Sequence, residues 1–118
     1  MKEGYDLRDR SYKFSLGLIK LLTTMNTGIA ISPIFNQLIR SGTSIGANIE
    51  EADSSSTRKD LKYKMIVAKK EAAETVYWLR LIIDAKLIKN EDNINITKNL
   101  LNECGQLVRI LGSITRKI

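Results

Sequence analysis

Histidine is absent from this 118-residue sequence, and cysteine occurs once, at Cys104. Histidine is the side chain that serves most often as a general base and as a metal ligand. A single cysteine forms no internal disulfide, and the lack of histidine makes a Cys–His nucleophile or a zinc site implausible. The composition therefore argues against most enzyme mechanisms, and we expect a protein without catalytic activity, cofactor or metal.

Long apolar runs and proline are also scarce. No segment approaches the roughly 20 consecutive apolar residues of a membrane span. The first residues, MKEGYDLRDRSYK, lack the apolar core of a signal peptide, so we expect a cytoplasmic protein with no membrane partner. The one proline, Pro33, leaves long segments free to be helical. With 43% apolar and 27% charged residues, the chain is typical of one soluble domain spanning residues 1–118.

Apolar residues recur at alternating steps of four and three along most of the chain, as in helices that bury one face. Pro33, Thr57 and either Asp92 or Asn93 are typical of helix starts. The sequence predicts an all-α protein, an antiparallel up-down four-helix bundle. The helices are expected near residues 8–25, 33–54, 58–87 and 94–117.

Residues 41–60, SGTSIGANIEEADSSSTRKD, are rich in small polar residues, which usually indicates a loop. However, the helical spacing of the preceding segment continues through Ser41, Ile45 and Ala52. Each glycine inside a helix costs about 1 kcal/mol relative to alanine, a cost that makes sense if a neighbouring backbone must approach closely. We therefore predict a packed helix over residues 41–52, with a loop only at 53–56.

Asn48 lies on the buried side of this predicted helix and needs a hydrogen-bond partner. Glu74, from the third helix, is one candidate. The pair is interpreted as a structural polar lock that fixes helix register, in preference to a substrate-binding site.

The third predicted helix has more apolar surface than a simple bundle requires. These residues lie opposite or beside its core-facing side, and in a monomer they would form an exposed patch. We predict an interface between copies of the chain, although scattered surface aromatics are a common alternative. The predicted interface residues are Tyr63, Ile66, Val67, Tyr77 and Trp78.

Positive charge is concentrated on the same helix. The whole chain carries a net charge of +6, and residues 58–70 hold six Lys or Arg against one Asp. Such a stripe can follow a phosphate backbone and would bind RNA or DNA by charge and shape, with little sequence readout. The alternatives are a solvated face, salt bridges to a neighbouring subunit, or a scaffold that docks an acidic protein. The first-choice contacts are Arg58, Lys62, Lys69 and Arg80, and the second choices are Arg40, Lys59, Lys70 and Arg109.

Two segments resemble a known family. Residues 38–52, LIRSGTSIGANIEEA, are similar to the signature R-S-A-T-S-I-G-A-N-I-A-E-G of the four-helix-bundle proteins encoded in intervening sequences of 23S rRNA genes. Residues 68–74, AKKEAAE, followed by Trp78-Leu79, resemble that family's A-R-x-S-x-A-E helix. The chain departs from the pattern at Ala52, where Gly is frequent, and at Glu71, where Ser is frequent.

The resemblance extends to the accessory variability determinants of diversity-generating retroelements, on residues 78–80, WLR, and 109–114, RILGSI. Those proteins are basic homopentameric barrels that bind nucleic acid and work with a reverse transcriptase. The resemblance therefore implies a ring-like homo-oligomer, with a pentamer favoured, and no enzyme activity. It leaves open whether the chain is associated with ribosomal RNA or with a reverse transcriptase.

Overall fold

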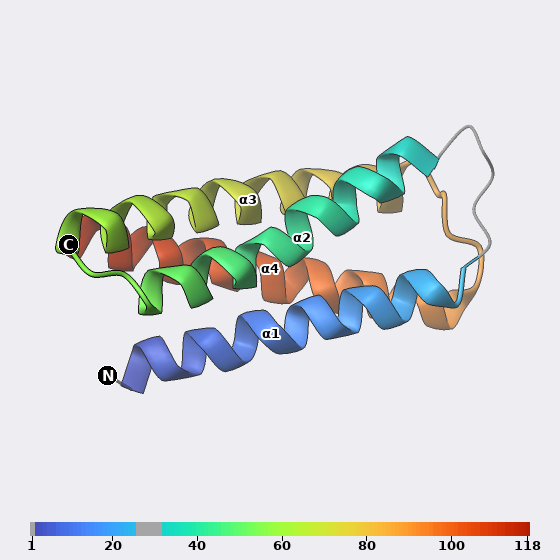
Figure 1. Cartoon of the computed structure of the whole chain (residues 1–118). Helices are drawn as coiled ribbons and strands as arrows, with labels where there is room; N and C mark the ends of the chain where they lie inside the picture. Colours follow the sequence, from blue (N-terminus) through green and yellow to red (C-terminus); the bar gives the residue numbers. More distant parts are fainter. Residues whose placement is uncertain (1, 26–31) are drawn as a thin grey trace.

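The computed structural model describes the backbone of residues 2–25 and 32–118, and the side chains of residues 7–25 and 32–118. Its four helices are α1 (Lys2–Thr23), α2 (Ser32–Asp53), α3 (Arg58–Asp84) and α4 (Glu91–Lys117). They run alternately up and down, so that both termini lie at the same end of the bundle (Figure 1). No strand occurs in the described ranges. The predicted all-α four-helix bundle is confirmed.

The helices form a square in which α1 and α3 occupy opposite corners. Each of these two helices packs against both α2 and α4, and the backbones of the described parts of α1 and α3 do not come within 8 Å of each other. One leucine from each helix illustrates the shared core, since all four are at most 1% exposed: Leu18, Leu38, Leu79 and Leu107. The outward faces of α1 and α3 therefore lie on opposite sides of the molecule.

The start of α3 agrees with the prediction, whereas the start of α4 and the end of α3 differ from it. Thr57 caps α3 as expected, with its side chain accepting a hydrogen bond from the Asp60 backbone N–H at 3.1 Å. The predicted caps of α4 were wrong, because Asn90 accepts from the backbone N–H of Asn93 at 2.9 Å and the helix begins at Glu91. Helix α3 ends at Asp84, before the predicted residue 87, since Lys86 has a φ of 56° that no right-handed helix adopts.

The segment of small residues is a packed helix, as predicted. Helix α2 continues to Asp53, and Gly42 and Gly46 are both buried. A Cβ atom on Gly46 would lie 3.4 Å from the main-chain oxygen of Ser11 in α1, and one on Gly42 would overlap the Leu18 side chain. Glycine therefore lets α1 and α2 approach closely along this line.

The predicted hydrogen bond between Asn48 and Glu74 was wrong. Asn48 is only half-buried, and its side-chain N–H donates to the main-chain oxygen of Ser44, one turn earlier, at 2.8 Å. Glu74 accepts hydrogen bonds from Arg40 and Trp78 instead. The buried polar contact between α2 and α3 is made by the hydroxyl oxygens of Ser41 and Thr75, which lie 2.9 Å apart and are both 0% exposed.

Candidate nucleic-acid interface

Ion pairs join three of the four pairs of neighbouring helices. Arg8 of α1 binds Glu50 of α2, and Arg10 of α1 binds Glu103 of α4, at 2.9 and 2.7 Å. Between α2 and α3, Arg40 binds Glu71 and Glu74, and Lys64 binds Glu51. No ion pair joins α3 to α4 in the described part of the chain. Among the described residues, α3 and α4 are thus the one pair of neighbouring helices without an ion pair between them.

Basic side chains gather on that remaining pair of helices. By helical periodicity, α3 presents one stripe of them toward α4 and α4 presents another toward α3. We call this set the α3–α4 seam. None of its members takes part in an ion pair with a described residue, and all are exposed except Lys69, which is half-buried. The seam consists of Arg58, Lys62, Lys69 and Arg80 from α3 and Lys98, Arg109 and Arg116 from α4.

The centre of the seam is at Gly112. A Cβ atom on Gly112 would lie 3.9 Å from Nζ of Lys69 and 3.4 Å from Nη1 of Arg116. Two cationic groups from different helices therefore approach the same point. These two positive charges repel each other, and an anion bound between them would relieve that repulsion.

The structure brings together five of the eight residues predicted to contact nucleic acid. All four first choices lie on the seam, and so does Arg109. Arg40 does not, because it pairs with Glu71 and Glu74 on the opposite side of α3. Hydrogen bonding to Glu74 raises the pKa of Arg40, in keeping with this tight pairing. Lys59 and Lys70 follow the outward face of α3, with Tyr63 and Tyr77.

Two residues of the seam escaped the prediction, Lys98 and Arg116. Arg116 follows Arg109 by seven residues, which places both on one side of a helix. That spacing was available in the sequence. The sequence alone does not show that this side of α4 packs beside the basic stripe of α3.

The outward face of α3 is apolar, as the sequence indicates. Tyr63, Ile66 and Tyr77 are 62%, 40% and 58% exposed, and we call these three residues the α3 face. Val67 and Trp78 are half-buried. The Trp78 ring N–H donates to Glu74 at 2.9 Å, and its ring packs edge-on against Tyr77 at 5.2 Å. Trp78 thus packs against Tyr77 of the α3 face while its ring N–H is held by Glu74.

A second apolar face lies on α1. Tyr12, Leu16 and Ile19 are 65%, 39% and 42% exposed, and we call them the α1 face. They are spaced by four and three residues, opposite the buried Leu18 of the same helix. This face was not predicted, although its spacing is a readable signal. Because α1 and α3 are diagonal in the bundle, the two apolar faces look in opposite directions.

The remaining chemistry of the described residues is sparse. Among them, no cluster of three or more His, Cys, Asp or Glu side chains is arranged to hold a metal ion. None of the described helices combines the length and apolar character that crossing a bilayer requires. Burial raises the pKa of the Cys104 thiol to about 12, and the thiol donates to the main-chain oxygen of Ala72. Cys104 is therefore a protonated core residue at neutral pH.

Comparison with known proteins gives one family. A crystal structure of a protein of unknown function from the S23 ribosomal protein family, from Bacteroides thetaiotaomicron VPI-5482, is 31% identical to this chain, with a TM-score of 0.78. The match covers 97% of this chain and 98% of that one. A search of curated proteins finds no match. The family model of the 23S rRNA-intervening sequence proteins matches residues 3–113, and the chain belongs to that family.

Proposed function

We propose that this protein binds structured RNA along the α3–α4 seam, by charge and shape. The observation that carries the proposal is the distribution of ion pairs. Acidic partners neutralise Arg8, Arg10, Arg40 and Lys64 on the other helix pairs, and none of the described residues neutralises the seam. Rigid helices that hold unpaired cations in two rows suit a phosphate backbone, which contributes one negative charge per nucleotide.

The family supports RNA as the nucleic acid. Its name ties it to the intervening sequences of 23S rRNA, and the solved relative is assigned to a ribosomal protein family. The seam offers no aromatic side chain for stacking, and its lysines and arginines are spread in rows along two rigid helices, so it suits contacts to the phosphate backbone. An accessory role beside a reverse transcriptase would use the same phosphate-binding surface.

The two apolar faces support a ring-like homo-oligomer. The α3 face of one copy can cover the α1 face of the next, since both are apolar and lie on opposite sides of the protomer. A contact between two different faces is heterologous, and such contacts close into rings when the rotation allows. The resemblance to the pentameric barrels favours five subunits. The ring would place several seams on one assembly and multiply their weak individual affinities.

The test is the salt dependence of RNA binding. Binding of a fluorescent RNA hairpin is measured by anisotropy at several salt concentrations. The variant R58Q/K62Q/K69Q is expected to bind more weakly and to lower the slope of log K against log salt by about one for each phosphate that is no longer neutralised. Unchanged affinity would refute the seam as the binding surface.

The matched control removes three exposed lysines away from the seam, in K20Q/K59Q/K70Q. This variant has the same net charge as R58Q/K62Q/K69Q, so the two differ only in where the charge is removed. We expect nearly wild-type binding. If both variants lose affinity equally, net charge is responsible and the seam has no special role.

The second candidate is a scaffold whose seam docks an acidic protein. The same unpaired cations favour it, because carboxylates would neutralise them as phosphates do. The two functions respond differently to heparin, an unstructured polyanion. An RNA-binding seam prefers the RNA hairpin to heparin at equal charge, whereas a seam that merely accepts anions binds both alike.

A further inference from the structure

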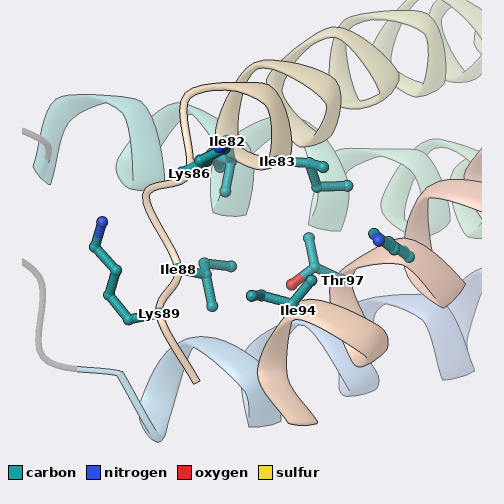
Figure 2. A pocket seen from close by; sticks show the side chains of 8 residues that line it. Ile82, Ile83, Lys86, Ile88, Lys89, Ile94 and Thr97 are labelled. Atoms are coloured by element: carbon teal, nitrogen blue, oxygen red, sulfur yellow. The ribbon is translucent and has the colours of Figure 1, made fainter. Parts of the chain in front are cut away.

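A cavity of about 390 Å³ opens at the end of the bundle where α3 turns into α4. Its floor is buried, with Ile82, Ile88 and Thr97 at 0%, 8% and 0% exposure. Ile83 of α3 and Ile94 of α4 form its walls, and the isoleucines converge on one space from three segments of chain (Figure 2). Its volume is within the range of about 300–1,000 Å³ that small-molecule pockets occupy.

The rim of this pocket is positively charged. Lys86, Lys89 and Lys98 line it, and all three are exposed. None of the described residues that line the cavity is acidic, and the structure describes no ion pair of these lysines. An apolar hollow surrounded by unpaired ammonium groups suits a ligand with a flat or apolar body and anionic groups at its edge.

The pocket continues the α3–α4 seam. Lys98 belongs to both, and it precedes Arg109 by eleven residues, or about 16 Å along the helix. Between them lies Gly105, where the nearest atom to an added Cβ is Nη1 of Arg109 at 4.0 Å. There is therefore room beside α4 at Gly105, between Arg109 and Lys98, and no acidic residue of α3 or α4 lines the pocket.

We propose that the pocket binds one unpaired nucleobase of the RNA whose backbone lies on the seam. The inference rests on the proposed RNA binding. Aliphatic walls can enclose a base by contact with its faces, as in proteins that accommodate extruded bases. Lys86, Lys89 and Lys98 then contact the phosphates on either side of that base.

The pocket has little means to identify the base. Among the described lining residues, Thr97 has the one hydroxyl, which already donates to the main-chain oxygen of Asn93 at 2.6 Å. The described residues that line the cavity include no side-chain amide or carboxylate. The site should therefore select an unpaired nucleotide over a paired one, with little preference among the bases, as stacking platforms do.

The experiment compares a perfectly paired RNA hairpin with the same hairpin carrying one bulged nucleotide, 2-aminopurine in a fluorescent version. The wild-type protein is expected to bind the bulged hairpin about tenfold more tightly, because a bulged base can enter the pocket without breaking a base pair. The 2-aminopurine emission should change on binding. Replacing the bulged base by each of the four natural bases should alter affinity by less than about threefold.

Two variants locate the effect. I83Q removes the branched apolar wall against which the base packs, and should reduce the preference for the bulge while leaving paired-hairpin binding intact. I96Q is the matched control, because Ile96 is 43% exposed on the same helix as Ile94 but does not line the cavity. Should I83Q unfold, K86Q/K89Q tests the rim without touching the wall, and should also reduce the preference.

Each outcome decides the inference. Equal affinity for both hairpins, with seam dependence retained, overturns the pocket site and leaves RNA binding standing. A bulge preference that survives in both I83Q and K86Q/K89Q also overturns it. Absence of binding to either hairpin overturns the proposed function and the pocket site together. Competition by free adenosine monophosphate at micromolar concentration would show a mononucleotide site and would equally contradict a base held within a strand.

Discussion

At the level of single residues, the cluster of Arg40, Glu74 and Trp78 shows how one carboxylate can fix two side chains. Glu74 accepts from the Trp78 ring N–H at 2.9 Å and binds the Arg40 guanidinium. Both contacts favour the charged form, and the Trp78 hydrogen bond is the largest cause of a pKa below the ordinary value of 4.5. The cluster thus holds Arg40 in ion pairs within the protomer.

The lowered pKa of Glu74 can be observed through Trp78, the only tryptophan of the chain. Protonation of Glu74 weakens the charged hydrogen bond to the indole, so the fluorescence should titrate with a midpoint below pH 4.5. A carboxylate with a lowered folded pKa stabilises the protein above its unfolded pKa, and this contribution disappears as pH falls through the folded pKa. Arg40→Gln should move the midpoint upward, toward 4.5.

The control for this titration is Arg58→Gln, which removes an exposed arginine without an acidic partner among the described residues and should leave the midpoint unchanged. A wild-type midpoint at or above pH 4.5 would contradict the assignment. A midpoint that does not move in the Arg40→Gln variant would also contradict the assignment.

At the level of helices, periodicity was enough to predict the bundle, but local capping and pairing were not. The steps of three and four predict the same helices whichever neighbours they have. Asp92 and Asn93 resemble Asn90 as caps, and only the geometry selects Asn90. Likewise, the stripe of Arg58, Lys62 and Lys69 is visible on one helix, whereas its match with α4 depends on the order of helices around the square.

The close contact between α1 and α2 gives a stability prediction. Gly46→Ala should change the free energy of unfolding by less than about 1 kcal/mol, since the helix-propensity gain of alanine offsets a Cβ placed 3.4 Å from the Ser11 oxygen. Gly46→Leu should cost about 3 kcal/mol, because the larger side chain meets the main chain of α1, which cannot rotate aside. Guanidinium unfolding followed by circular dichroism, at one protein concentration, measures both.

The matched control is Ala47→Leu, which adds a side chain of the same size at the exposed neighbouring position of α2. It should leave stability within about 0.5 kcal/mol of the wild type. If Gly46→Leu unfolds at the same denaturant concentration as Ala47→Leu, close packing is not the reason for glycine at position 46.

At the level of the whole molecule, charge and apolar surface are divided among different sides of the bundle. The seam lies between α3 and α4, while the α1 face and the α3 face look outward from opposite corners. The sequence indicated the α3 face because Tyr63, Ile66 and Tyr77 lie opposite the core-facing side of their helix. The spacing of the three residues of the α1 face was readable in the sequence as well, but the opposite direction of the two faces depends on which helices are diagonal.

This arrangement allows a test that separates a ring from a symmetric dimer. Leu16→Glu puts a charge on the α1 face, and Ile66→Glu puts one on the α3 face, each at a position about 40% exposed in the protomer. In a ring built from α1-to-α3 contacts, either substitution disrupts every contact, so each variant should be a monomer by light scattering. The contact is lost because burying an unpaired carboxylate in an apolar interface is energetically unfavourable.

Mixing the two monomeric variants then distinguishes an α1-to-α3 contact from an α3-to-α3 contact. The Leu16→Glu protein keeps an intact α3 face, and the Ile66→Glu protein keeps an intact α1 face. One native contact can therefore form between them, but the complex ends in two blocked faces and cannot grow. Light scattering should show a 1:1 heterodimer and nothing larger. If the interface were instead α3 against α3, Leu16→Glu alone would remain associated and the mixture would form no heterodimer, because every Ile66→Glu chain would carry the blocked face.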